Sequence, residues 1–143
     1  IVKKFIANNG NKLNGNSLVM ATVMVLELPY SIDTLSTEDV KVLCNDIPKA
    51  AKLRNCEAMT LENLPGIWQR TKYTVKRLRT KGDIEMIQYL VFYKNKAISI
   101  QGQVLTTNNK LSEKELLREY IKYEPVFDYI ANSLVLKKMY GIK

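Results

Sequence analysis

The stretch YLVFYKNKAISIQGQVL, residues 89–105, decides how this chain folds. Two runs rich in β-branched, aromatic and aliphatic residues flank Lys94-Asn95-Lys96, a segment typical of a tight turn. The stretch therefore predicts two antiparallel strands. A two-residue loop pairs odd positions of the first strand with even positions of the second. One face of the hairpin then carries Ile87, Tyr89, Val91, Tyr93, Ile98, Ile100 and Val104.

The opposite face of this hairpin is more polar. It carries Gln88, Leu90, Phe92, Ser99, Gln101 and Gln103. We therefore predict that the tyrosine and isoleucine face lies against the core beneath the helices, and that the two glutamines after Ile100 lie on the solvated side. Gly102 then faces the core, where it indicates a bulge or the close approach of a helix.

The strand before the hairpin, about residues 67–78, extends the sheet. Its apolar odd-numbered residues join the core face only if the following loop has an odd length, and Gly82 fits the left-handed position of such a loop. The even-numbered residues then join the polar outer face. This face is a candidate shallow binding surface formed by Trp68, Arg70, Lys72, Phe92, Gln101 and Gln103. The alternative is a solvated face without a ligand, with Trp68 half-buried in packing.

Two segments carry the signals of helix starts. Ser36-Thr37-Glu38-Asp39 and Ser112-Glu113-Lys114-Glu115 each place a capping hydroxyl before acidic residues, and an apolar stripe at helical spacing follows each of them. Pro125 is predicted to stop or kink the second helix. Residues 1–6 have the apolar spacing of a helix end, followed by the stop signal Asn8-Asn9-Gly10.

The remaining apolar runs, residues 18–28 and about 53–61, have strand length. Together these elements predict an α+β fold, an antiparallel β-sheet (meander) with helices packed mainly on one face. A chain of 143 residues, 46% of them hydrophobic, suits a single domain over residues 1–143. Because the sequence begins with Ile1 instead of Met, we expect further residues upstream.

Three segments resemble the Mog1/PsbP-like group of α+β domains. They are the run LPGIW at residues 64–68, the hairpin of residues 89–100, and the closing run PVFDYIANS at residues 125–133, in which Phe127, Ile130 and Ser133 match the group's spacing. The resemblance covers about residues 18–136, and residues 1–6 have no counterpart in it. It implies a non-enzymatic binding or assembly role. It carries over no binding residue, because the matched positions are structural.

The chain is basic, with 22 lysines and arginines against 14 acidic residues and a net charge of +8. Such a charge attracts polyanions such as nucleic acid or an anionic membrane surface. The densest basic cluster is predicted at a hairpin tip and contains Lys76, Arg77, Arg79 and Lys81. Since side chains alternate along a strand, only some of these face one ligand. The alternative is a cationic surface with no dedicated ligand.

The sequence lacks the residues that several kinds of catalysis and ligand binding require. Histidine is absent, which excludes His-based acid–base catalysis and His-containing metal sites. Neither a GxGxxG nor a GxxxxGK phosphate loop occurs. Acidic pairs lie where helix caps or solvated faces explain them. We therefore predict no catalytic residue, no metal and no cofactor.

The two cysteines are Cys44 and Cys56. Cys44 lies on the apolar stripe of a predicted helix, which favours a buried thiol. The helix end and the returning strand also allow a disulfide if the two Cα atoms come within about 7 Å. A disulfide, or a signal peptide upstream, would indicate a location outside the cytoplasm, and without either the location stays open.

These patterns favour a non-catalytic binding or assembly module with a protein partner. The alternative is a cationic domain that binds nucleic acid or an anionic surface through the hairpin-tip cluster and the Trp68 face. No stretch reaches the roughly 20 apolar residues of a membrane-spanning helix. An enzyme is the third-ranked class.

Overall fold

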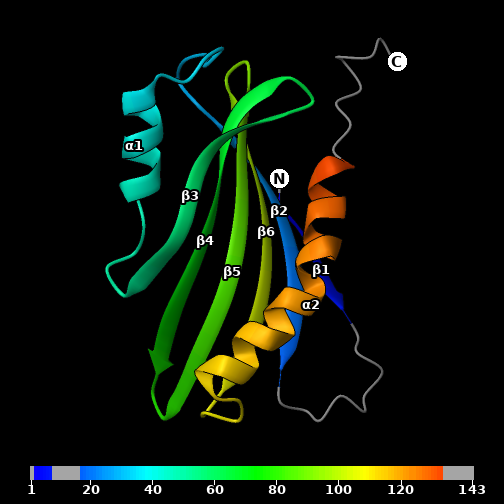
Figure 1. Ribbon diagram of the computed structural model, residues 1–143. Helices are drawn as coiled ribbons and strands as arrows, with labels where there is room; N and C mark the ends of the chain where they lie inside the picture. The colour runs from blue at the N-terminus through cyan, green and yellow to red at the C-terminus, as the bar shows by residue number, and fades with distance from the viewer. Residues whose placement is uncertain (1, 8–16, 134–143) are drawn as a thin grey trace.

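The computed structural model describes residues 2–7 and 17–133. One antiparallel sheet contains the six strands of these residues, in the order β1-β2-β6-β5-β4-β3 (Figure 1). The strands are β1 (Val2–Ala7), β2 (Leu18–Glu27), β3 (Ala51–Leu61), β4 (Leu64–Arg77), β5 (Thr80–Tyr93) and β6 (Lys96–Thr107). Strands β4 to β6 form the predicted meander, which β3 extends. Strand β2, from earlier in the chain, pairs with β6.

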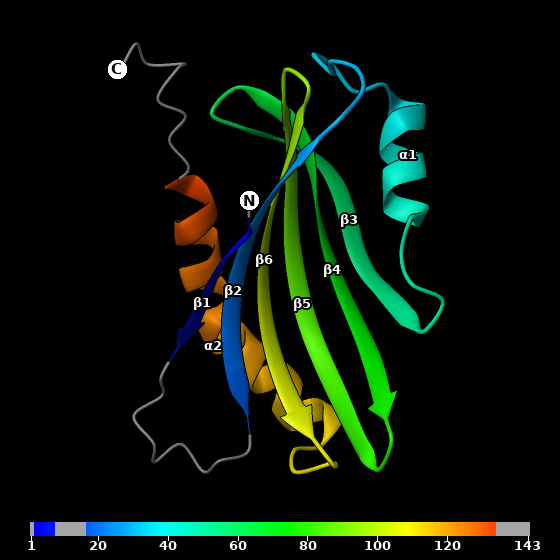
Figure 2. The ribbon, with the colours of Figure 1, turned by 180° about the vertical axis from the view of Figure 1, so that it is seen from behind.

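Two helices accompany this sheet. The long helix α2 (Glu113–Asn132) packs across β5 and β6, and the short helix α1 (Thr37–Asn45) lies near β3 and β4. Figure 1 shows α2 in front of the sheet, and Figure 2, seen from behind, shows strands in front of α2. The predicted α+β fold with an antiparallel meander is confirmed. The short helix covers only an edge of the face away from α2.

The two predicted helix starts are confirmed. Ser36 precedes α1, where its hydroxyl accepts from Asp39 N at 3.1 Å while Asp39 Oδ2 accepts from Ser36 N at 2.8 Å. Ser112 and Glu115 make the same reciprocal pair at the start of α2. Each pair satisfies backbone N–H groups that a helix start leaves without a partner, so the local sequence fixes where both helices begin.

The prediction of a helix end over residues 1–6 is wrong. Val2–Ala7 form strand β1, which pairs antiparallel with β2 from Val2 opposite Met24 to Ala7 opposite Val19. An isolated helix of this length is only marginally stable in water, whereas the free edge of β2 offers backbone partners along its whole length. The predicted stop signal at residues 8–10 lies outside the described residues.

Helix α2 continues through Pro125, so of the two predicted outcomes, a stop or a kink, the stop is wrong. Proline cannot donate the backbone bond to Ile121 O four residues earlier. Ile121 is 56% exposed, so water can reach that side of the helix. Beyond the proline, Phe127 and Ala131 are buried against the sheet. This packing offsets the lost bond and keeps the last turns of α2 in place.

The loop between β4 and β5 has two residues, Leu78 and Arg79, and not the odd length that we predicted. Arg77 pairs directly with Thr80, and Gly82 lies within β5 opposite Val75. Leu78 takes the positive φ of 52° that we had assigned to Gly82. Because a two-residue loop reverses parity, the even-numbered residues of β4 share a face with the odd-numbered residues of β5.

The predicted core face of the hairpin is confirmed. Tyr89, Val91, Ile100 and Val104 are 6%, 0%, 2% and 0% exposed, and they form one apolar cluster with Leu116, Tyr120 and Phe127 of α2. A Cβ on Gly102 would overlap the Phe127 ring, so the predicted close approach of a helix at Gly102 is also confirmed.

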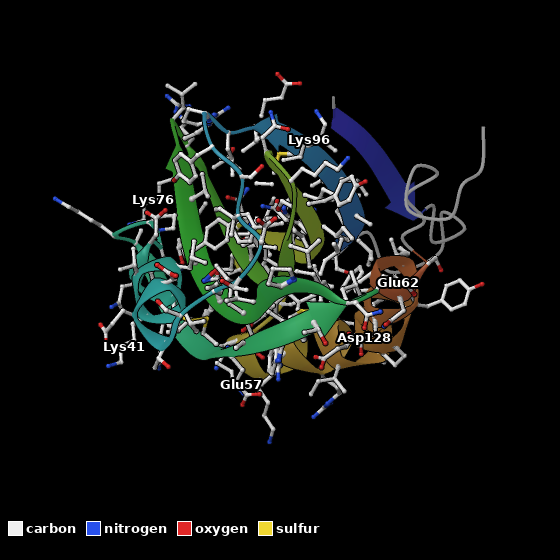
Figure 3. All side chains as sticks on the ribbon, turned by 90° about the horizontal axis from the view of Figure 1, so that it is seen from above. Lys41, Glu57, Glu62, Lys76, Lys96 and Asp128 are labelled. Carbon is white, nitrogen blue, oxygen red and sulfur yellow. A yellow bond between two sulfur atoms is a disulfide. The ribbon has the colours of Figure 1, made fainter. Side chains whose placement is uncertain are left out.

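Charged side chains surround this core. Figure 3, viewed from above, shows Lys41, Glu57 and Lys96 at the periphery of the fold. Within the described residues, neither helix has the length and apolar composition needed to cross a membrane.

Candidate binding site

The predicted binding surface is divided between the two faces of the sheet. Trp68, Arg70 and Lys72 lie opposite Tyr89, Ile87 and Glu85, so they share the face that α2 covers. Phe92, Gln101 and Gln103 lie on the other face, because Gln101 and Gln103 pair with Gln88 and Met86. The grouping of these six residues on one outer face is therefore wrong. Its cause is the parity of the β4–β5 loop.

Arg70 and Lys72 hold α2 against the sheet. The Arg70 guanidinium lies over the Tyr120 ring, 4.8 Å from its centroid, and Arg70 Nε lies 3.6 Å from Glu124 Oε2. Lys72 Nζ lies 2.8 Å from Glu113 Oε1 and lowers the pKa of that carboxyl group. Their cationic groups are thus engaged within the fold.

Trp68 is half-buried and packs against the apolar core, which confirms the structural alternative for this residue.

A buried ion pair beneath the start of α2 was not predicted. Arg54 donates to both carboxylate oxygens of Glu85, Nε at 2.9 Å and Nη2 at 2.5 Å, and Glu85 is only 1% exposed. Arg54 Nη2 also lies 3.4 Å from Glu113 Oε1. The sequence did contain a signal, since Glu85 shares the parity of Ile87 and Tyr89 and therefore had to face the core.

Phe92 is only 4% exposed, so the prediction of an exposed aromatic there is wrong. The segment between β2 and α1 is held beside it: Leu28 N donates to Asn95 O at 2.7 Å and Ile32 N to Lys94 O at 3.0 Å. Residues 30–35 and α1 line a cavity of about 560 Å³ together with Phe92. No sequence pattern indicates this cover of Phe92, because the cover depends on where a loop crosses the sheet.

The face of the sheet away from α2 carries a row of side-chain amides. Gln69, Gln88 and Gln101 lie directly opposite one another on β4, β5 and β6, and Thr22 of β2 continues the row. We call this the glutamine face. It contains the Gln101 and Gln103 that the sequence singled out, together with Gln69 of β4.

A cavity of about 230 Å³ opens on the glutamine face, and we call it the glutamine pocket. Its floor is formed by sheet residues and its wall by the segment after α1; the lining residues are Asp46, Ile47, Pro48, Gln69, Thr71, Tyr73, Met86, Gln88 and Gln101. Burial raises the pKa of the Tyr73 hydroxyl, which donates to Met86 Sδ at 3.8 Å.

A disulfide fixes the wall of this pocket. Cys44 of α1 is bonded to Cys56 of β3, with 5.9 Å between their Cα atoms. The expectation of a buried free thiol at Cys44 is therefore wrong, and the alternative of a bridge is the one that the structure forms. Ala51 N also donates to Pro48 O at 2.8 Å. Together these bonds hold residues 46–48 over Gln69, the cross-strand partner of Cys56.

Two polar groups in the glutamine pocket have no hydrogen-bond partner. They are Gln69 Nε2 and Thr71 Oγ1, and their residues are 5% and 2% exposed. The neighbouring amides are engaged: Gln88 Nε2 donates to Ser99 Oγ at 2.8 Å, and Gln101 Oε1 accepts from Gln103 Nε2 at 3.4 Å. A buried polar group without a partner costs about 1–3 kcal/mol. The pocket therefore presents hydrogen-bonding capacity that the described residues do not use.

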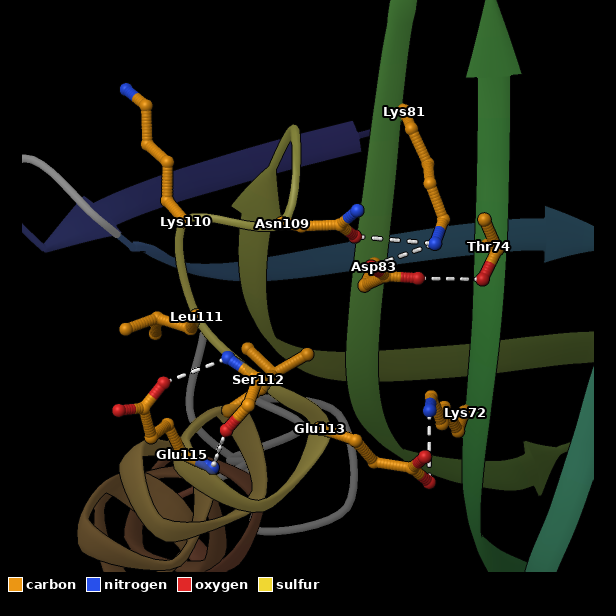
Figure 4. Close-up of a pocket in the computed structure, with 11 residues that line it drawn as sticks. Lys72, Thr74, Lys81, Asp83, Asn109, Lys110, Leu111, Ser112, Glu113 and Glu115 are labelled. Atoms are coloured by element: carbon orange, nitrogen blue, oxygen red, sulfur yellow. Dashed lines mark hydrogen bonds and ion pairs between the residues drawn. The ribbon is translucent and has the colours of Figure 1, made fainter.

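A larger cavity, of about 550 Å³, lies between the ends of β4 and β5 and the start of α2 (Figure 4). Its charged groups already bind one another. Lys72 meets Glu113, Lys81 lies 3.7 Å from Asp83 Oδ2 and 3.2 Å from Asn109 Oδ1, and Glu115 caps α2. Because these charged groups already have partners within the fold, this cavity is a weaker candidate binding site than the glutamine pocket.

The four predicted basic-patch residues lie around the β4–β5 hairpin tip. Lys76, Arg77 and Arg79 are exposed, whereas Lys81 is half-buried and bound to Asp83 and Asn109. Lys76 lies directly opposite Lys81, and Arg77 lies opposite Thr80 on the other face. As predicted, alternation divides these cations between two directions.

Comparison with solved structures finds the same fold in a bacterial protein. The crystal structure of PA94, a protein of unknown function from Pseudomonas aeruginosa, matches 95% of this chain and 83% of that chain with a TM-score of 0.61 and 10% sequence identity. At this identity the match shows the fold alone. No family model and no curated protein matches the sequence.

Proposed function

We propose that this chain is a non-catalytic module that binds a partner protein through the glutamine face, and that the glutamine pocket receives one neutral amide or hydroxyl side chain of that partner. The observation that carries this proposal is the pair of buried groups without partners, Gln69 Nε2 and Thr71 Oγ1, in one small cavity. A partner's hydrogen bonds would remove the cost of leaving them unpaired.

The size of the pocket supports a single side chain as its occupant. Sites for cofactors and drug-sized ligands usually enclose about 300–1,000 Å³. The glutamine pocket encloses about 230 Å³. Amide and hydroxyl groups donate and accept without carrying charge, so they suit a neutral polar side chain better than an ion.

The chemistry of the lining supports binding over catalysis. Amides and hydroxyls do not ionise near neutral pH, and Asp46 supplies the one carboxylate of the lining. Among residues 2–7 and 17–133, no cluster of three His, Cys, Asp or Glu side chains could hold a metal ion. The resemblance to Mog1/PsbP-like domains belongs to this proposal, because it implies the same non-enzymatic role.

The disulfide supports a location outside the cytoplasm. Disulfides persist in oxidising compartments and are rare where thioredoxin and glutathione keep thiols reduced. The Cys44–Cys56 bridge closes a loop against the edge of the sheet. We therefore include an extracytoplasmic location in the proposal.

Replacing Thr71 tests whether its hydroxyl is kept for a partner. Thr71→Val removes an unpaired buried hydroxyl and keeps the shape, so we expect the free energy of unfolding to rise by about 1 kcal/mol, measured by urea denaturation. Thr106→Val is the matched control, because Thr106 is equally buried and its hydroxyl is not among the buried groups without a partner. It should lower stability. A loss of stability in Thr71→Val would remove the main support for the pocket.

Small blocked amino acids then test the pocket directly. The probes are N-acetyl-asparagine amide and N-acetyl-threonine amide, with N-acetyl-aspartate amide as the charged control. We expect the neutral probes alone to shift the NMR signals of the side-chain amides of Gln69 and Gln101, and Gln69→Leu to abolish the effect. Met24→Leu, on the same face but outside the pocket lining, should leave it unchanged. Equal shifts by the charged probe would contradict the proposal.

One separate observation favours the alternative class, an anionic partner. Among the described residues, Lys76, Arg77 and Arg79 have no ion-pair partner at the β4–β5 tip. None of these three residues lines the glutamine pocket, so an anionic ligand at the tip would be a second, separate ligand.

A further inference from the structure

The apex of the β4–β5 hairpin exposes a leucine. Leu78 is 107% exposed, more than any other large hydrophobic residue of the described chain. It is the first of the two loop residues between Arg77 and Thr80. Its side chain thus projects into solvent at the end of two long strands, where it contributes nothing to the core.

The backbone at this apex is also unfavourable for leucine. Leu78 has a φ of 52°, in the left-handed region where glycine and asparagine are favoured and a bulky side chain is uncommon. Below it, Lys76 lies directly opposite Lys81, and like charges in that position repel. Local rules of sequence are broken mainly where function requires it. Two such departures within six residues point to a function of the tip.

The cations around Leu78 are available to a ligand. Lys76, Arg77 and Arg79 are exposed, and no carboxylate of the described residues pairs with them. Lys81 is different, because it is bound to Asp83 and Asn109 and remains part of the fold. The tip therefore combines one apolar side chain with three cations that no described carboxylate pairs with: Arg79 beside Leu78 in the loop, and Lys76 and Arg77 behind it.

We propose that this hairpin tip binds anionic lipid bilayers: Leu78 enters the boundary between headgroups and acyl chains, and Lys76, Arg77 and Arg79 bind the lipid phosphates. An apolar side chain at the apex, with one cation beside it and two behind it, suits the boundary of an anionic membrane surface, where charged headgroups border hydrocarbon. Nucleic acid would use the cations but offers no apolar layer for a leucine at the apex. The proposal is independent of the glutamine pocket.

Vesicle co-sedimentation tests this proposal with the intact chain. The probes are phosphatidylcholine vesicles with about 30% phosphatidylserine and pure phosphatidylcholine vesicles. We expect binding to the anionic vesicles only. Leu78→Asn should weaken it about tenfold, because the apolar contribution is lost. Asparagine tolerates a positive φ, so this variant should fold at least as stably as the parent chain.

Two matched variants separate the tip from general properties of the surface. Val42→Asn removes another exposed apolar side chain, on α1, and should leave binding unchanged. Neutralising Lys76, Arg77 and Arg79 to glutamine should weaken binding about 100-fold, from a roughly fivefold effect of each cation. The triple change of Lys49, Lys94 and Lys114 to glutamine gives the same net charge and should have a much smaller effect.

A tryptophan at the apex measures insertion. In Leu78→Trp, lipids brominated on the acyl chain should quench the added fluorescence, while Trp68 of the parent chain, half-buried under α2, should stay unquenched. Unchanged vesicle binding in Leu78→Asn, or the absence of binding at low salt, would overturn the proposal. So would binding to a single-stranded oligonucleotide that needs the three cations and not Leu78, without vesicle binding.

Discussion

Gly102 sets how closely α2 approaches the sheet. Its position on β6 faces Phe127, and there is no space there for even one additional carbon atom. The three large buried side chains of α2, Leu116, Tyr120 and Phe127, all depend on this close contact. A larger side chain at this position would therefore overpack the core, and overpacking lowers the free energy of unfolding as a cavity does.

Gly102→Ala should lower the free energy of unfolding by about 2 kcal/mol or more, because its methyl group must displace the Phe127 ring. Chemical denaturation measures the loss. The double change Gly102→Ala with Phe127→Leu should recover part of it, since leucine is smaller. Unchanged stability in Gly102→Ala would contradict the close contact between Gly102 and the Phe127 ring.

Arg54 pairs with Glu85, a carboxylate that lies deep beneath α2. Arg54→Leu should lower the free energy of unfolding by about 3–5 kcal/mol, because it leaves Glu85 buried without its partner. The double variant Arg54→Leu with Glu85→Leu should be much more stable than the single variant. If the two changes were instead additive in urea denaturation, the pair would not be acting as a unit.

At the scale of the elements, the start of α2 lies beside charged residues of the neighbouring strands. Its first acidic residue, Glu113, connects it to β3 through Arg54 and to β4 through Lys72. The backbone and side-chain bonds of Ser112 hold the pKa of Glu115 below its usual value of 4.5, and Lys72 does the same for Glu113. Acid should therefore weaken this helix start.

Glu115→Gln should flatten the acid limb of the stability curve. A carboxylate whose folded pKa lies below its unfolded value stabilises the fold above the unfolded pKa, and this contribution is lost as the pH falls through the folded pKa. The melting temperature, followed from about pH 6 to about pH 3, should thus fall less steeply in the variant. The control is Glu57→Gln, at an exposed position on β3.

The whole molecule is stabilised unequally across the sheet. β5 and β6 have neighbours on both sides and α2 above them, whereas α1 contains no buried residue and lies at the β3–β4 edge. The disulfide holds this weak end, and the 12-residue separation of its cysteines corresponds to about 3 kcal/mol of loop entropy.

Cys44→Ser with Cys56→Ser should therefore release α1 without unfolding β5 and β6. Hydrogen exchange should show lost protection in α1 and in residues 46–48, with the central strands still protected. The same variant should lose the response of Gln69 to the neutral amide probes, because the wall of the glutamine pocket is no longer fixed. A uniform loss of protection over the whole sheet would contradict this division.

The sequence by itself determined the features that depend on neighbours along the chain: the Tyr89–Leu105 hairpin and its core face, both capped helix starts and the meander of β4 to β6. Only the tertiary structure decided which way β4 faces, that Val2–Ala7 form a strand, and that Cys44 meets Cys56. The physical reason is that side-chain alternation shows which residues of a strand share a face, but not which of its two faces is turned toward the core. One residue more or less in the preceding loop exchanges the two faces. Pairing at a free sheet edge and the disulfide across 12 residues depend on contacts that form only after the chain has folded back on itself.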